Sequence, residues 1–138
     1  MLLDMKTLCQ YRLDHAKEDL VAAENNHLAG FYMAAIDRSY HAIFHSIRAV
    51  NALDNFDVSK HSAVIAHFNQ FYVHTGEFDR EICKLIDSAY RIREKCDFSD
   101  FFTISKADSE DQLKHAQDFV NTVDIYLNQK INQEEKQS

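Results

Sequence analysis

Five polar side chains that could act on a phosphodiester lie close together in one stretch of the chain. They are Asp37, Arg38, His41, His45 and Arg48. In an α-helix, Arg38 and His45 would lie about 20° apart around the axis. An arginine can hold a phosphate through its fork of N–H donors, and a histidine can move a proton to or from a ribose hydroxyl near neutral pH. The spacing therefore predicts a polar strip on one side of a helix, with chemistry that suits RNA or a nucleotide.

The same pattern has an interpretation that needs no function. Charged residues on one side of an amphipathic helix usually form its solvated face, and this is the more common meaning of such a strip. His61 is open to the same two interpretations, because it lies near the start of the next predicted helix. Free N–H groups there could help to hold an anion, but an ordinary first-turn histidine is the more frequent case.

A metal site and a cofactor site are both disfavoured. Asp37 and His45 lie eight residues apart, or about 12 Å along a helix, so Asp37, His41 and His45 cannot share one ion whose ligands lie within about 2.5 Å. Nothing in the sequence indicates ligands from other helices. There is no glycine-rich phosphate loop and no nucleophile elbow. The three cysteines, Cys9, Cys83 and Cys96, have no metal-type spacing and are predicted to be reduced thiols.

The chain predicts an all-α fold. It has no proline and two glycines among 138 residues, whereas sheet-rich domains need turn residues between short strands. Apolar residues at helical spacing predict five helices, with approximate bounds 3–26, 29–53, 59–75, 79–95 and 105–127. Each has one apolar face, so they must pack as an up-and-down bundle of four to five helices. This single domain, 1–127, is followed by a polar tail, 128–138, that we expect to fray.

The predicted helix ends depend on a few capping residues. Ser59, Asp79 and Ser105 are the expected N-caps of the last three helices, and Gly76 is the expected residue just beyond the third. Between the fourth and fifth helices, residues 96–104 form an aromatic-rich link.

The charge balance limits the partners of the chain. Acids outnumber bases, 22 to 15, for a net charge of −7, so tight and non-specific binding of nucleic acid by the chain alone is disfavoured. A local basic pocket or a basic partner stays open. No apolar run is long enough to span a membrane, and the N-terminus lacks the apolar region of a signal peptide. Together with three cysteines that are predicted to be reduced, these features indicate a cytoplasmic protein without a membrane partner.

The order of several motifs resembles that of HEPN-domain proteins. In their bacterial and archaeal subgroup, the second helix reads Asn/Asp-Arg-x-Tyr-Tyr-Ala-x-Phe-His, and here the run from Asp37 to His45 is similar. The stretch Lys60 to Ile65, with Phe71 and Thr75-Gly76, resembles the third helix of the subgroup. Residues 89–98 resemble its Arg-x-x-x-Asp-Tyr element. The resemblance spans about residues 10–127, and its specificity comes from the order and spacing of the motifs together.

This resemblance implies a helical bundle that usually forms a homodimer. Many HEPN proteins are metal-independent ribonucleases whose site is an arginine followed, after four to six residues, by a histidine, and two copies complete the site at the dimer axis. They are often encoded beside a minimal nucleotidyltransferase in toxin–antitoxin pairs. By this resemblance, Arg38 would hold the scissile phosphate and His45 would be the general acid or base, oriented by Asp37 or His41.

The chain departs from the ribonuclease pattern in its second half. In well-studied ribonuclease members the motif lies late in the chain, whereas here no histidine follows Arg91 and Arg93 at that spacing. His41 also replaces the second tyrosine of the subgroup. Three functions stay open: a non-catalytic module that binds a nucleotide or a partner nucleotidyltransferase through Asp37, His41, Arg48 and His61, a ribonuclease toxin, and a purely structural interaction domain. The net charge and the missing late histidine favour the first.

Overall fold

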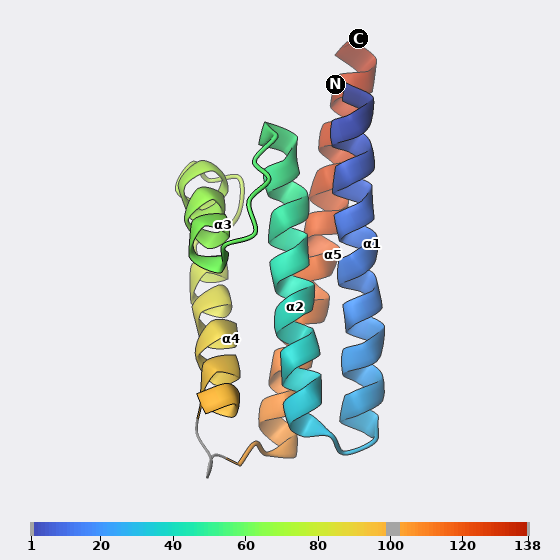
Figure 1. Cartoon of the computed structure of the whole chain (residues 1–138). Coiled ribbons are helices and arrows are strands. Elements are labelled where there is room, and N and C mark those ends of the chain that lie inside the picture. Colours follow the sequence, from blue (N-terminus) through green and yellow to red (C-terminus); the bar gives the residue numbers. More distant parts are fainter. Residues whose placement is uncertain (1, 99–102, 138) are drawn as a thin grey trace.

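The described part of the chain folds into α-helices and contains no strand. The computed structural model describes residues 2–98 and 103–137. Its helices are α1 (Leu2–Leu28), α2 (Tyr32–Asn51), α3 (His61–Phe68), α4 (Glu81–Phe98) and α5 (Lys106–Gln137). In Figure 1, α1 and α2 run antiparallel, and α3 and α4 lie beside α2 on the side away from α1. Helix α3 runs upward in this view, α4 runs back down, and α5 returns upward behind α2. This arrangement confirms the predicted all-α, up-and-down bundle.

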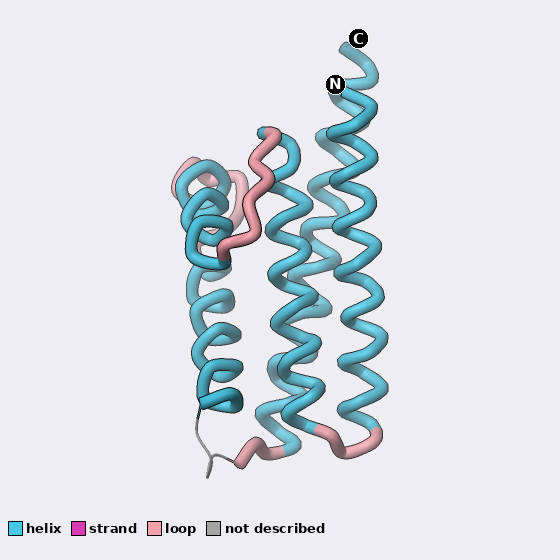
Figure 2. The backbone as a smooth tube through the Cα atoms, in the orientation of Figure 1, coloured by secondary structure: helices cyan, strands magenta, loops and turns pink. Residues whose placement is uncertain are grey.

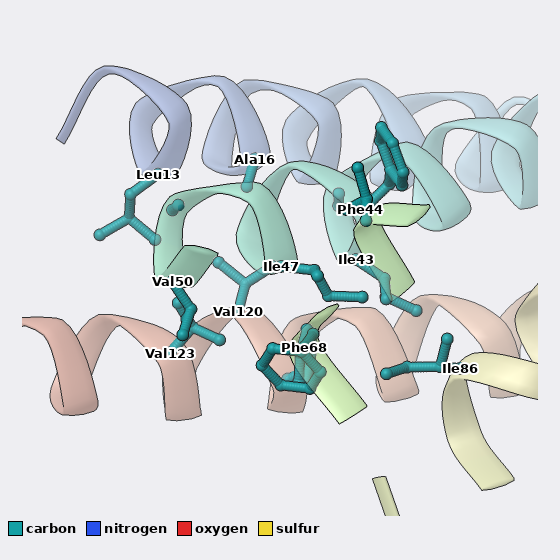
Figure 3. Packing of buried hydrophobic residues seen from close by; sticks show 14 of the residues in the cluster. Leu13, Ala16, Ile43, Phe44, Ile47, Val50, Phe68, Ile86, Val120 and Val123 are labelled. Atoms are coloured by element: carbon teal, nitrogen blue, oxygen red, sulfur yellow. The ribbon is translucent and has the colours of Figure 1, made fainter. Parts of the chain in front are cut away.

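Helix α2 lies at the centre of the bundle and contacts each of the other four α-helices. Its buried side chains meet those of α1, α3, α4 and α5 in a single core, shown from close by in Figure 3. The fully enclosed members include Leu13, Ile43, Ile47, Phe68 and Val123. Burying a large aliphatic or aromatic side chain stabilises a fold by roughly 1.5–3 kcal/mol, so this core holds the helices in place around α2.

A tight turn connects α1 to α2 (Figure 2). Gly30 has φ +85° and follows α1. The Phe31 N–H donates to the Asn26 carbonyl over 2.8 Å, and the Gly30 N–H donates to the His27 carbonyl over 3.0 Å. These bonds form a Schellman motif, whose left-handed residue is best supplied by glycine. The motif ends α1 sharply and directs the chain back into α2.

Two of the three predicted N-caps are confirmed. Asp79 Oδ1 accepts the backbone N–H of Glu81 over 3.0 Å. Ser105 Oγ accepts the N–H of Asp108 over 3.0 Å, and Asp108 Oδ2 accepts the N–H of Ser105 over 3.3 Å, which is a reciprocal capping box. The prediction for Ser59 is wrong. Lys60 occupies the N-cap of α3, with no capping hydrogen bond from its side chain.

The third and fifth helices differ from their predicted extents. Helix α3 is eight residues long and continues as a π-helical turn, Asn69–Val73. Helix α4 includes Cys96 and Asp97 and runs to Phe98, so the predicted aromatic link begins later than expected, and its residues 99–102 lie outside the described part. Helix α5 continues past Leu127 through the polar segment to Gln137.

Contacts of Lys130 explain part of this extension. Its ammonium group lies 3.6 Å from Glu77 Oε1 and 5.5 Å from the centre of the Tyr126 ring, and such contacts can stabilise a helix beyond its apolar stripe. Among the described residues, no helix combines the length and the apolar character needed to cross a membrane.

Candidate functional site

A narrow polar strip is the part of α2 that the other helices leave uncovered. From Ala35 to Asn51, every residue of α2 is buried except five, and these are Asp37, Arg38, His41, His45 and Arg48. We call this set the α2 strip. A surface helix would expose a broad face, whereas α2 is buried on all other sides between Ala35 and Asn51. The strip is therefore a narrow polar surface on a core helix. It is not the broad solvated face that a surface helix would have.

Asp19 of α1 brings together the two residues predicted for catalysis. Asp19 Oδ1 accepts a hydrogen bond from Arg38 Nη1 over 3.0 Å, and Asp19 Oδ2 lies 2.7 Å from His45 Nδ1. The Asp19 side chain is 10% exposed, whereas those of Arg38 and His45 are 36% and 21% exposed. An ionised carboxylate can only accept, so Nδ1 of His45 carries a proton, and a neutral ring would present the lone pair of Nε2.

Asp37 links the strip to α4. Its Oδ2 accepts from Arg38 Nη2 over 3.0 Å, and its Oδ1 accepts from Arg93 Nε over 3.2 Å. Burial alone would raise the pKa of Asp37, but the hydrogen bonds from Arg38 and Arg93 outweigh it and hold the pKa below its ordinary value. Of the two late arginines, Arg93 thus contacts the strip, while Arg91 pairs with Asp87 on the exposed side of α4, at 2.8 Å.

A second ion-pair group lies at the other end of the strip. Arg48 Nη2 donates to Asp57 Oδ1 over 3.1 Å, and Arg12 of α1 donates to the same oxygen. Arg12 also donates to the Arg48 carbonyl over 3.3 Å. The hydrogen bond from Arg12 is the largest influence on Asp57 and, with the one from Arg48, lowers its pKa. The loop that carries Asp57 is held against α1 and α2 by these bonds.

His61 packs against the aromatic residues of α2. Its ring stacks on Phe44 with centroids 3.9 Å apart, and its Nδ1 lies 2.8 Å from the Tyr40 hydroxyl. Burial, followed by the charge of Arg93, lowers the pKa of His61 below 6.5. Burial also raises the pKa of Tyr40 to about 12, so both groups are neutral at pH 7. His61 is therefore linked to α2 through Tyr40 and Phe44, which are α2 residues outside the strip.

Two further rings on α1 extend the site beyond the predicted residues. The His15 ring packs edge-on against His45 with centroids 5.1 Å apart, and Tyr11 lies 5.2 Å from His15. Tyr11 is 62% exposed. The strip thus has aromatic surface beside His45, on the side of α1.

The structure assigns the orientation of His45 differently from the expectation. The carboxylate that contacts His45 is that of Asp19. The Asp37 carboxylate instead binds Arg38 and Arg93, and His41 Nδ1 lies 2.8 Å from the backbone oxygen of Asp37. Arg12 and Asp19 were missed because they are far from the strip in sequence. A signal existed, however, since both fall in helical register with the core residues Leu13, Ala16 and Ala23. In the structure, each of the two residues as a whole is 7% exposed. Charged residues at buried positions need partners.

No metal site is formed by the described side chains. Among them, no group of three or more histidines, cysteines, aspartates or glutamates is arranged to hold an ion. Cys9, Cys83 and Cys96 form no disulfide with one another.

Comparisons with known proteins show which family the chain resembles. The sequence model of the HEPN domain matches residues 9–126. Two relatives come from Methanocaldococcus jannaschii. Putative toxin MJ0142 is 29% identical over 127 residues, which cover 92% of this chain and 86% of the relative. Putative toxin MJ0605 is 31% identical over 96 residues, covering 70% and 72%.

A third relative lacks a functional name. It is a UPF0332 protein of Thermotoga maritima, 26% identical over 91 residues, which cover 66% of this chain and 69% of the relative. The family match spans most of the chain, including all five residues of the α2 strip. The chain belongs to the HEPN-domain family.

Proposed function

We propose that this HEPN-domain protein is a toxin-type ribonuclease that cleaves RNA without a metal ion. The observation that carries the proposal is the shared carboxylate of Asp19, which lies 3.0 Å from Arg38 Nη1 and 2.7 Å from His45 Nδ1. Such an arrangement holds a phosphate-binding group and a proton-transfer group side by side. Two relatives that carry the name of toxins support the same role.

The chemistry that suits this pair is an internal transesterification. Nε2 of His45 takes the proton of a ribose 2′-hydroxyl, and the 2′-oxygen forms a bond to the neighbouring phosphorus. The bond from phosphorus to the 5′-oxygen breaks, and that oxygen receives a proton from an acid. Arg38 stabilises the charge on the phosphate oxygens. The products are a 2′,3′-cyclic phosphate and a free 5′-hydroxyl, and the acid is His45 of a second copy in a homodimer.

The ion pairs of the strip are compatible with phosphate binding. Asp37 and Asp57 have side chains that are 37% and 56% exposed, so a phosphate can displace them from Arg38 and Arg48 at little cost, since exposed ion pairs contribute little to stability. Asp19 is buried and stays in place to orient His45. The exposed carboxylates thus hold the arginines in position until RNA arrives.

A second candidate function is favoured by a different observation. The arginines of the strip are paired within the chain, and the net charge is −7. Both features suit a non-catalytic module that binds a nucleotide, or a minimal nucleotidyltransferase that completes a toxin–antitoxin pair in the cytoplasm. Co-purification with the product of the adjacent gene tests this alternative. A monomer that retains neither nucleotide nor partner would favour the third possibility, a purely structural domain in which the ion pairs only support the fold.

Cleavage of a single-stranded RNA in the presence of a chelator tests the ribonuclease directly. The wild-type protein should produce fragments with cyclic phosphate ends, and His45→Ala should lower the rate by roughly 10²–10⁴-fold, the usual contribution of a general acid or base. His74→Ala is the matched control, because His74 is exposed in the turn after the π-helical segment. A wild-type protein that cleaves no RNA above background would refute the proposal.

A further inference from the structure

Arg12 and Arg48 form a positively charged site at the opposite end of the α2 strip from Arg38. Both guanidinium groups donate to the same carboxylate oxygen, Asp57 Oδ1, and Arg48 does so over 3.1 Å. The Arg12 side chain is 8% exposed, and its hydrogen bond to the Arg48 carbonyl, over 3.3 Å, fixes its direction. The two arginines are therefore preorganised around one anionic oxygen.

Asp57 occupies this site as a replaceable carboxylate. It lies in the loop before α3, and its side chain is 56% exposed. Exposed ion pairs contribute little to stability, so an external anion can take its place. Two arginines and one carboxylate leave one positive charge uncompensated in this group, and Arg48 Nε is buried without a hydrogen-bond partner among the described residues. A phosphodiester suits the pair because it presents two non-bridging oxygens to two guanidinium groups.

Aromatic side chains of α1 line the path from this site to His45. Tyr11 directly precedes Arg12, and its ring centroid lies 5.2 Å from that of His15, which packs edge-on against His45 at 5.1 Å. Tyr11 is largely exposed, so its ring is accessible to a base, and such stacking tolerates any sequence. An acidic peptide could also satisfy the arginines, but it has no base to place on these rings. The surface therefore favours a single RNA strand.

The separation of the two arginine sites indicates a polynucleotide. Arg38 and Arg48 are ten residues apart on one helix, or about 15 Å along its axis. This separation exceeds the distance between neighbouring phosphates of one RNA strand. A mononucleotide can therefore fill only one of the two sites, whereas a strand that continues past the scissile phosphate can fill both.

We propose that Arg12 and Arg48 form a second phosphate subsite for single-stranded RNA, and that Asp57 fills this subsite until the RNA displaces it. The inference rests on the proposed function and deepens it, because it adds a contact at a distance from the scissile phosphate held by Arg38. The substrate is thus a single-stranded polynucleotide whose bases are free to stack on Tyr11. Asp57 acts as an intramolecular competitor of that strand.

Replacement of the competing carboxylate tests the inference most directly. The probe is single-stranded oligouridine, and its binding is measured by fluorescence anisotropy with the full-length protein in the His45→Ala background, so that it is not cleaved. Asp57→Asn removes the charge with little change of shape and should tighten binding by up to about fivefold, the upper value for an exposed ion pair. A merely structural role of Asp57 predicts no gain. Asp87→Asn is the matched control, because Asp87 is 58% exposed and pairs with Arg91 on α4.

The salt dependence of binding counts the phosphates that the protein contacts. In the same background, Arg48→Gln should weaken oligouridine binding and lower the slope of log K against log salt by about 0.7, the value for one phosphate of a single strand. Arg38→Gln should lower the slope by a similar amount, and the double variant by about 1.4, because the two arginines bind different phosphates. Arg91→Gln is the control for the loss of one positive charge and should leave the slope unchanged.

The outcomes separate the subsite from the ribonuclease. No gain from Asp57→Asn, or an unchanged salt slope for Arg48→Gln, would overturn the inference, and RNA cleavage by the wild-type protein would then leave the ribonuclease intact. The expected changes in binding without cleavage by the wild-type protein would refute the ribonuclease alone. A protein that does not bind oligouridine at all would overturn both.

Discussion

Asp19 of α1 and His45 of α2 face each other across the contact between two helices, with Asp19 Oδ2 2.7 Å from His45 Nδ1. They are 26 residues apart in the chain, and α1 packs more extensively against α2 than any other helix does. The orientation of His45 therefore depends on the rigid packing of α1 on α2. A group held in this way loses little conformational entropy when substrate binds.

Asp19→Asn should reduce RNA cleavage while leaving the protein folded. The amide is close in shape to the carboxylate but lacks its charge, so it stabilises a protonated His45 less and no longer pairs with Arg38. We expect the cleavage rate to fall by roughly tenfold or more, with an unchanged circular dichroism spectrum. Asp14→Asn is the control, since Asp14 is exposed on α1. Wild-type cleavage by Asp19→Asn would contradict the assigned role.

The position of α2 at the centre of the core leads to a prediction that concerns stability alone. Ile47 is 1% exposed, and Ile47→Ala should lower the free energy of unfolding by about 2–5 kcal/mol because it leaves a cavity. The control is Ile125→Ala, since Ile125 on α5 is 53% exposed and surface changes cost less than about 0.5 kcal/mol. Urea unfolding monitored by circular dichroism measures both. Similar losses for the two variants would show that α2 does not lie at the centre of the core.

The start of α5 allows a matched test of capping. Ser105 Oγ accepts the Asp108 N–H over 3.0 Å, so Ser105→Ala should destabilise the protein by about 1 kcal/mol. Ser59 makes no capping bond to α3, whose N-cap is Lys60, and Ser59→Ala should change stability by less than about 0.5 kcal/mol. Thermal or urea unfolding distinguishes the two, and a larger loss for Ser59→Ala would contradict the observed start of α3.

His61 should make stability depend on pH below neutrality. Its pKa in the folded protein is lowered by burial and by the charge of Arg93, relative to 6.5 when unperturbed. The unfolded chain therefore binds the proton more readily, so stability is greatest above pH 6.5 and is lost as the pH falls through the folded pKa. His61→Asn should flatten this part of the stability profile, because an amide does not titrate there.

His74→Ala is the control for the loss of a histidine side chain in this pH series, since His74 is exposed. Urea midpoints measured between pH 7.5 and about pH 5 follow the change. A wild-type protein that gains stability as the pH falls across this window would contradict the sign.

Local sequence patterns determined most of the helices and the position of the strip. The apolar residues at helical spacing, the scarcity of glycine and proline, and the caps Asp79 and Ser105 act over a few residues, so they can be read from the chain. The angular proximity of Arg38 and His45 follows from helix geometry in the same way. The family resemblance, carried by the motif from Asp37 to His45, was confirmed by the HEPN match over residues 9–126.

Helix ends were harder to predict where tertiary contacts decide them. The Ser59 cap failed because the start of α3 is placed by its packing, with His61 stacked on Phe44, and packing overrides a weak local preference. The polar end of α5 stays helical where Lys130 meets Glu77, a contact between residues 53 positions apart in the sequence. Propensity carries no information about such pairs.

The partners of the strip were decided by the tertiary structure alone. Periodicity places Asp19 and Arg12 on the apolar side of α1, but only the packing of α1 against α2 brings Asp19 to His45 and Arg12 to Asp57. Likewise, α4 supplies Arg93 to Asp37 from 56 residues away. The sequence by itself determined that Arg38 and His45 share one side of a helix. The structure decided that a buried carboxylate orients them, because the position of a side chain on a neighbouring helix depends on how the helices pack.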